Sequence, residues 1–291
     1  MFAGSLVALI TPMDSNGKLD EAALRSLVHW HLDNNTDGIV PVGTTGEAST
    51  LSMAEHCRVV ELVVEEAQGR IPVLAGCGSN NTAAAIALHE HANRAGATAA
   101  LHVTAYYNRP SQEGIYRHFE AISKSNDLPI IVYNIPARAI VDISVETMIR
   151  LAELPSVAGV KDATQNLTRP SLERLQIDKP FSYLSGEDMT AVAYNACGGM
   201  GCISVTANVA PALCAAMQQA CADADFVTAR QIQDRLMPLH SALFIEPSPA
   251  GIKYACSRLK LCEETPRLPI LPLGRRTRLQ IDNALSALEL I

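Results

Sequence analysis

Short apolar runs alternate with helical patterns along most of the chain, and this alternation constrains the fold more than any other feature. Asp20, Ser52 and Ser144 lie between runs and each precedes a helical pattern, as N-cap residues do. The runs are too apolar to face water on either side, which is typical of parallel strands covered by helices. Eight β–α units of this kind predict a (β/α)₈ TIM barrel. The expected strands are residues 5–10, 38–42, 71–76, 98–104, 129–133, 157–161, 181–185 and 201–205.

A doubly wound protein of two domains is the alternative for a chain of 291 residues. No linker rich in Pro, Gly or Ser divides the chain, and no G-x-G-x-x-G motif opens a helix, so the barrel is favoured. We expect the catalytic barrel to occupy residues 1–224 and a C-terminal helical extension to occupy residues 225–291. The last four helical patterns are residues 211–222, 225–239, 248–259 and 275–290.

Composition and charge exclude several classes of protein. Hydrophobic residues make up 48% of the chain, which rules out intrinsic disorder. The net charge of −7 and the scattered Lys and Arg residues argue against a nucleic-acid partner. No apolar run approaches the roughly 18 residues of a membrane span, and no basic residue precedes the first run, so we expect neither membrane insertion nor a signal peptide. The cysteines form no C-x-x-C pair, which suits a reducing, cytoplasmic location.

Lys161 is the only lysine that closes an apolar strand. Alternation places it on one face with two small neighbours, Gly159 and Ala163, which leaves the amine room inside the barrel mouth. Burial there favours the neutral amine, a nucleophile that forms a Schiff base with a ketone. The competing interpretation is a lysine salt-bridged at the strand mouth, for example to Asp162, and position alone does not decide between the two.

Tyr133 and the segment after the second strand are candidate partners of this lysine. Tyr133 ends the fifth strand and can point into the same mouth, where a phenol relays protons, although a lone tyrosine more often fills space. The G-T-T-G-E segment at residues 43–47 brings the hydroxyls of Thr44 and Thr45 and several N–H groups toward a small ligand. It is closer to an anion cradle than to a P-loop, because the P-loop lysine is absent.

Two other motifs are interpreted as structural. The G-G-M-G segment at residues 198–201 precedes the last strand, at the face of a barrel opposite the chemistry. His29 and His31, and likewise His89 and His91, lie on expected helices, where positions i and i+2 diverge by about 200°. We interpret both pairs as solvated helix faces and expect no metal and no other cofactor.

Several motifs in order resemble those of the dihydrodipicolinate synthase family, class I aldolases of the pyruvate-lyase superfamily. The likeness extends from Ser5 to the E-P-S-P segment at residues 246–249 and so covers nearly the whole chain. Two small departures are Ala105, where the family usually has Pro, and Ala137, where Gly or Ser is common. The motifs are Gly43-Thr44-Thr45-Gly46-Glu47, Tyr106-Tyr107, Tyr133-Asn134-Ile135-Pro136-x-Arg138, Gly159-Val160-Lys161-Asp162 and Ser185-Gly186-Glu187-Asp188.

The resemblance implies that a Schiff base between Lys161 and pyruvate condenses with L-aspartate 4-semialdehyde to give 4-hydroxy-tetrahydrodipicolinate, for diaminopimelate and lysine synthesis. It also implies a homotetramer built from dimers, acting on these small molecules. The implied proton relay is Tyr133, Thr44 and, from a neighbouring subunit, Tyr107. The implied substrate contacts are Thr45 and Ile203 to the pyruvate-derived group, Arg138 to the semialdehyde carboxylate, and Gly186 beside the lysine.

Many members of this family are inhibited by lysine, which binds at the dimer interface. Ala84 stands where inhibited members carry Glu, Met53 where many have His, and Ala48 where Ser is usual. An acceptor carboxylate for the effector's ammonium is therefore missing, and we predict weak or absent inhibition by lysine. The equivalent positions that keep a polar group are Ser49, His56, Asn80 and Tyr106.

Two other functions stay open from the sequence. A sister lyase, either N-acetylneuraminate lyase or a 2-keto-3-deoxy sugar-acid aldolase, shares the lysine and the first tyrosine, but Thr45, Tyr107 and Arg138 favour the synthase. A barrel that binds pyruvate-like ligands as a regulator would require a broken proton relay, and every residue of the relay is present.

Overall fold

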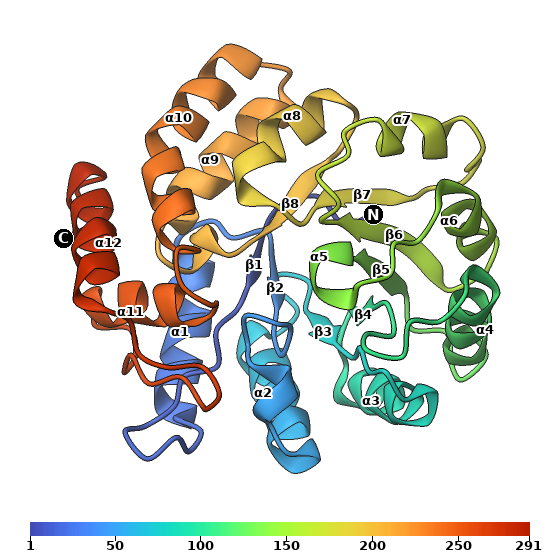
Figure 1. The fold of residues 1–291 in the computed structure, drawn as a ribbon, viewed down its shortest axis with the longest axis horizontal. Coiled ribbons are helices and arrows are strands. Elements are labelled where there is room, and N and C mark those ends of the chain that lie inside the picture. Colours follow the sequence, from blue (N-terminus) through green and yellow to red (C-terminus); the bar gives the residue numbers. More distant parts are fainter.

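The computed structural model describes residues 1–291 and contains a barrel of eight parallel strands surrounded by helices (Figure 1). The strands are β1 (Gly4–Ala8), β2 (Gly38–Val40), β3 (Leu74–Gly76), β4 (Ala99–Val103), β5 (Ile130–Asn134), β6 (Val157–Asp162), β7 (Ser182–Ser185) and β8 (Gly201–Ser204). Hydrogen-bonded neighbours follow the order β2-β1-β8-β7-β6-β5-β4-β3, and a parallel bridge between Ile39 and Val73 brings β2 beside β3. The predicted (β/α)₈ barrel is confirmed, with ladders shorter than the apolar runs at β2 and β3.

Helices connect successive strands and form the outer layer. As the sequence predicts, the Asp20 side chain caps the first helix, Ser144 caps the sixth, and Ser52 forms a reciprocal capping box with Glu55. The short α5 was not expected, and it begins with Pro136, whose missing N–H is harmless at a first helical position. The connecting elements are α1 (Glu21–Asp33), η1 (Ala48–Thr50), α2 (Met53–Ala67), α3 (Thr82–Ala95), α4 (Gln112–Ser123), α5 (Pro136–Ala139), α6 (Val145–Ala152), α7 (Arg169–Arg174), η2 (Asp188–Thr190), α8 (Ala191–Ala196), η3 (Thr206–Asn208) and α9 (Pro211–Ala222).

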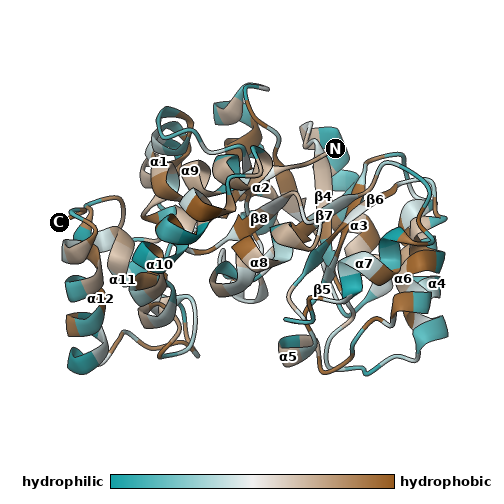
Figure 2. Ribbon diagram, turned by 90° about the horizontal axis from the view of Figure 1, so that it is seen from above, coloured by the Kyte–Doolittle hydropathy of each residue, from teal (hydrophilic) through white to brown (hydrophobic).

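A cluster of 10 buried side chains fills the barrel interior. Burying one aliphatic side chain contributes about 1.5–3 kcal/mol, so this core holds the strand ends in place. Larger cores lie between the barrel and the helices, several of which show a hydrophobic and a hydrophilic face (Figure 2). The interior cluster consists of Leu6, Ala8, Val40, Leu74, Ala99, Leu101, Ile131, Tyr133, Leu184 and Ile203.

Three helices form the C-terminal extension: α10 (Phe226–Ala242), α11 (Ala250–Arg258) and α12 (Arg275–Ala287). They lie on the side of the barrel where α1 and α9 are found (Figures 1 and 2). Helix α10 packs against α9 and α12, and α11 packs against α12. The Tyr254 hydroxyl and the Arg258 guanidinium, both on α11, donate to Asp282 on α12 at 3.0 and 2.8 Å. The extension is therefore fastened both internally and to the barrel.

Two of the four helix histidines contradict the prediction of solvated faces. His31 and His89 have no exposed surface, and the His89 ring lies within hydrogen-bonding distance, 3.1 Å, of the His102 ring. His29 and His91 instead pair with glutamates nearer the surface. The divergence of i and i+2 on a helix explains the correction, because it turns one member of each pair toward the core. No group of three or more His, Cys, Asp or Glu side chains could hold a metal ion.

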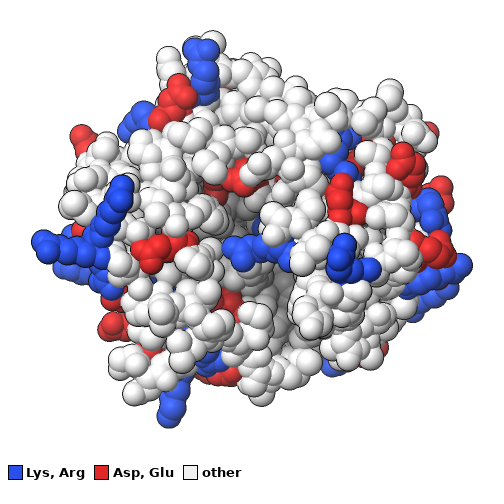
Figure 3. All heavy atoms as spheres, viewed as in Figure 1, with Lys and Arg blue, Asp and Glu red and all other residues white.

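Acidic and basic side chains are interspersed over the face seen in Figure 3, which is hollowed near its centre. A single-sign stripe, such as nucleic-acid binding requires, is not seen on this face. None of the helices combines the length and the apolar character that crossing a membrane demands.

Candidate active site

Lys161 lies near the C-terminal end of β6, and only 6% of it is exposed. Its register partner on β5 is Tyr133, and Lys161 Nζ lies 4.3 Å from the centroid of the Tyr133 ring. Gly186, just after β7, leaves space for the lysine: a Cβ there would lie 3.1 Å from Lys161 Cε. The Lys161 amine is therefore buried against the face of the Tyr133 ring, in space that is available because Gly186 has no side chain.

Asp162 lies on the opposite face of β6, as strand alternation predicts. Its carboxylate lies 3.7 Å from the guanidinium of Arg169, which also contacts Glu173 at 3.2 Å. Burial raises the pKa of Asp162 and raises the pKa of Glu173 to about 7. Asp162 is therefore engaged with Arg169 behind the strand, and the interpretation of Lys161 as its salt-bridge partner is wrong.

The loop of residues 43–47 follows β2 and brings two hydroxyls to the same mouth. Gly46 is the position where this turn needs a glycine, because a Cβ there would lie only 2.9 Å from the backbone nitrogen of Val42. The resulting tight turn lets the side chains of Thr44 and Thr45 line the cavity beside Lys161.

A cavity of about 200 Å³ joins these residues at the strand ends. Lys161 is the only lysine in its wall, to which Arg138, exposed on α5, also belongs. The structure thus brings together six of the predicted catalytic and substrate-binding residues, namely Thr44, Thr45, Tyr133, Arg138, Lys161 and Gly186.

Sequence reasoning missed two wall residues from the C-terminal extension. Phe244 and Ser248, between α10 and α11, line the cavity, and Phe244 is 41% exposed. Both are remote in sequence from every strand end, so no local pattern marks them. The extension is therefore part of the site's wall.

Asp188 has a structural role that the sequence of its motif, residues 185–188, did not predict. Its Oδ2 accepts hydrogen bonds from the backbone N–H groups of Val205 at 2.9 Å and Thr206 at 3.3 Å, and the Ser204 hydroxyl donates to its Oδ1. This buried carboxylate ties the segment after β7 to the end of β8, and its position within a few residues of the end of β7 was the available signal. Both carboxylate oxygens of Asp188 accept hydrogen bonds from the protein, so we interpret Asp188 as a residue that holds the cavity wall in place.

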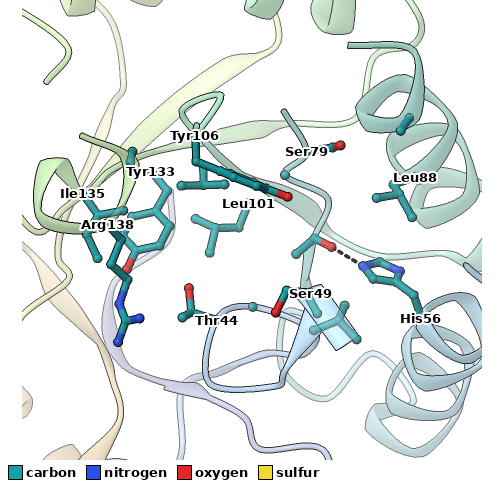
Figure 4. A pocket seen from close by; sticks show the side chains of 18 of the residues that line it. Thr44, Ser49, His56, Ser79, Leu88, Leu101, Tyr106, Tyr133, Ile135 and Arg138 are labelled. Atoms are coloured by element: carbon teal, nitrogen blue, oxygen red, sulfur yellow. Dashed lines mark hydrogen bonds between the residues drawn. The ribbon is translucent and has the colours of Figure 1, made fainter. Parts of the chain in front are cut away.

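A second cavity of about 460 Å³ adjoins the first (Figure 4). Ser49, His56 and Tyr106 line it, and the His56 Nε2 lies 2.8 Å from the carbonyl oxygen of Gly76. Burial lowers the pKa of His56 to about 4, so its ring is neutral near pH 7. The wall contains no Asp or Glu side chain; Ala48, Met53 and Ala84 belong to it instead.

Three predicted residues lie outside both cavity walls. Tyr107 is 86% exposed and has a left-handed backbone with φ 69°, so its ring projects away from its own chain. Ile203 is buried in the barrel core. The carbonyl oxygen of Asn80 accepts a hydrogen bond from Asn108 at 2.7 Å.

Comparison with known proteins places this geometry in a family. The model of the dihydrodipicolinate synthetase family matches residues 1–288. The chain belongs to the dihydrodipicolinate synthetase family. Among family members, a 4-hydroxy-tetrahydrodipicolinate synthase from Parvibaculum lavamentivorans is 57% identical over 291 residues, which cover 100% of both chains.

Solved structures of the family agree over the whole fold. The chloride-inhibited dihydrodipicolinate synthase from Acinetobacter baumannii, complexed with pyruvate, superimposes with a TM-score of 0.97 at 42% identity, covering 100% of both chains. The enzyme from Cyanidioschyzon merolae with lysine bound has a TM-score of 0.97 at 32% identity, covering 100% of this chain and 99% of that one. Of the two departures from the dihydrodipicolinate synthetase family pattern, Ala105 is buried and Ala137 lines the smaller cavity without closing it.

Proposed function

We propose that the chain condenses pyruvate with L-aspartate 4-semialdehyde to form 4-hydroxy-tetrahydrodipicolinate through a Schiff base on Lys161. The observation that carries this proposal is the buried Lys161 amine, which lies 4.3 Å from the Tyr133 ring centroid in a cavity that holds no other lysine. The name and full-length similarity of the Parvibaculum enzyme support the same reaction.

The chemistry follows from a lysine nucleophile. The amine adds to the ketone carbon of pyruvate, and loss of water leaves a protonated imine. The imine withdraws electrons, so C3 loses a proton and the resulting enamine attacks the aldehyde carbon of the second substrate. The amine of that substrate then attacks the imine carbon, which closes a six-membered ring and releases Lys161. One water is released for each product formed.

The proton transfers fall to hydroxyl groups, since no histidine lines this cavity. We assign them to a relay of Tyr133, Thr44 and, from a neighbouring subunit, Tyr107. Figure 4 supports the first pair, because the Thr44 hydroxyl and the Tyr133 ring border the same space.

Substrate binding is assigned to the remaining predicted residues. Thr45 binds the carboxylate of the pyruvate-derived group, with Ile203 behind it, and Gly186 keeps open the space beside the lysine. Arg138 binds the carboxylate of the semialdehyde, since a guanidinium offers two parallel donors to a carboxylate.

The exposure of Tyr107 bears on assembly. A tyrosine ring that is 86% exposed completes no relay within its own chain, so we propose that it enters the site of a second copy in a dimer. We further propose that two dimers form a homotetramer and that the enzyme works in the cytoplasm, where its eight free cysteines stay reduced.

A coupled assay with both substrates tests the reaction, and borohydride reduction in the presence of pyruvate tests the intermediate. We expect one pyruvyl adduct, on Lys161, and none on Lys253, the other buried lysine, whose ammonium pairs with Glu47. The Lys161→Ala variant is the control and should be inactive. Cleavage of a sugar acid without turnover of the semialdehyde would identify a sister lyase, and pyruvate binding without turnover of either would identify a regulator.

A further inference from the structure

Glu47 ends the loop that carries Thr44 and Thr45, and it has an unfavourable backbone conformation. Its φ of 57° and ψ of 34° are left-handed, which residues with a Cβ rarely adopt. Only 4% of the residue is exposed, so water does not solvate its carboxylate. Contacts from elsewhere must therefore hold Glu47 where it is.

Those contacts come from the C-terminal extension. The Lys253 ammonium, on α11, lies 2.5 Å from Glu47 Oε1, and the backbone N–H of Arg267 donates to Oε2 at 2.8 Å. Lys253 has no exposed surface, and its one other polar contact is the carbonyl oxygen of Thr265 at 2.8 Å. The Arg267 side chain donates to the carbonyl oxygen of Thr50, at 2.8 Å, on the far side of the loop.

The loop transmits the position of Glu47 to Thr44, which is assigned to the proton relay, and to Thr45, which is assigned to substrate binding. The N–H of Glu47 donates to the carbonyl oxygen of Thr44 at 3.1 Å, and the N–H of Ala48 donates to that of Gly43 at 3.3 Å. These bonds close the turn on itself. A movement of the Glu47 backbone therefore moves the peptide unit of Thr44, whose hydroxyl borders the cavities (Figure 4).

We propose that Lys253 is a positioning residue of the active site, which acts through Glu47 to set the loop that carries Thr44 and Thr45. The inference rests on the proposed function, because it gives this loop a catalytic task. A buried pair could instead serve folding alone, since breaking one is strongly destabilising. Removing both charges distinguishes the folding role from the positioning role. A variant that lacks both the Lys253 ammonium and the Glu47 carboxylate has no unpaired buried charge, so it regains stability, but it does not regain the contact that holds the loop.

The test compares Lys253→Met, the double variant Lys253→Met with Glu47→Gln, and Lys260→Met. Lys260 is an exposed lysine just after α11 and serves as the matched control. Because a misplacement of about 1 Å can cost about 10²-fold in rate, we expect kcat/KM for pyruvate to fall roughly 10- to 100-fold in both Lys253 variants. KM for the semialdehyde should stay within about twofold of wild type, since Arg138 lies on α5. Hydrogen exchange of the amides of residues 44–48 should be faster in the same variants.

A double variant that regains both stability and wild-type kinetics would overturn the proposal and leave the pair with a folding role. Lys253 variants that behave like Lys260→Met would overturn it as well. If neither Lys253 variant folds, Glu47→Gln replaces them in the same comparison. Its single carbonyl oxygen can accept from the Lys253 ammonium or the Arg267 N–H, while its NH2 group faces the other donor, so one of the two contacts is lost. We expect the same fall in kcat/KM for pyruvate, and wild-type values would refute the proposal. An inactive wild-type enzyme would reject the proposed function instead, so the two failures are distinguishable.

Discussion

Replacing Gly186 with alanine should displace Lys161 and slow Schiff-base formation while the barrel stays folded. The new Cβ would lie 2.9 Å from Ala163 Cβ and 3.1 Å from Lys161 Cε, whereas ordinary contacts begin near 3.4 Å. The contact with the Ala163 Cβ can be relieved only by a small backbone shift, which the hydrogen bond from the Ala163 N–H to the carbonyl oxygen of Asn134 opposes. The contact with Lys161 is relieved when its flexible side chain moves by a few tenths of an ångström. Since the backbone at Gly186 is not left-handed, alanine can adopt it.

The magnitude follows from that displacement. If about 1 Å of misplacement costs about 10²-fold, a few tenths should lower kcat roughly 3- to 10-fold. Overpacking should lower the free energy of unfolding by about 1–3 kcal/mol. The assay is the rate at which borohydride traps the pyruvate adduct on Lys161, measured with kcat in the coupled assay. Gly274→Ala is the control, because its added Cβ meets only Glu246 Oε1, at 3.4 Å. Trapping and turnover at wild-type rates in Gly186→Ala would refute the claim that this glycine makes room for the amine.

Four further predictions concern the site and stability. Tyr133→Phe should lower kcat by about 10²- to 10⁴-fold with little loss of stability, and near-normal turnover would make Tyr133 a packing residue. Arg138→Lys should raise KM for the semialdehyde more than KM for pyruvate, because an ammonium cannot copy the guanidinium fork; equal changes would argue for general positioning. With Ala84 in place of a carboxylate, lysine should lose about 1.5–3 kcal/mol of binding, roughly 10- to 150-fold, so half-inhibition at low micromolar lysine would contradict the prediction. Burial lowers the pKa of His31 from 6.5 to about 3 and that of His56 to about 4. The unfolded chain therefore binds more protons than the folded one below pH 6.5, and the free energy of unfolding should fall as the pH drops from about 6.5 toward 4, by up to about 1.4 kcal/mol per pH unit for each histidine. Urea midpoints that do not change between pH 7 and 5 would contradict this.

Most of the barrel could be predicted from local patterns, because each strand and helix carries its own signal. A run of apolar residues and a cap such as Ser52 need no knowledge of the rest of the chain. The pairing of Lys161 with Tyr133 was also predictable, since neighbouring parallel strands bring their C-terminal ends together. The prediction failed at His31 although a local signal was present. Leu24, Leu27, Val28 and His31 follow the i, i+3, i+4, i+7 spacing of one helix face, and this is the face of α1 that meets the core.

Contacts between distant segments carried no such signal. Phe244 reaches the cavity, and Lys253 reaches Glu47, only because the C-terminal helices pack back against the side of the barrel. No periodicity marks a buried lysine within an apolar helix as the partner of a loop about two hundred residues earlier. Such pairs depend on the tertiary arrangement, so they become visible only in the structure.

The two cavities share a wall, and this bears on regulation whatever ligand the larger cavity holds. Thr44, Tyr133 and Arg138 line both, so a molecule in the larger cavity would touch side chains that border the Lys161 cavity. Communication between the cavities therefore needs no long path and no rearrangement of the barrel. Ala84 lies in the wall of the larger cavity alone. A substitution there changes how tightly an effector is held, whereas the contact that would transmit its presence, through Thr44 and Tyr133, stays in place.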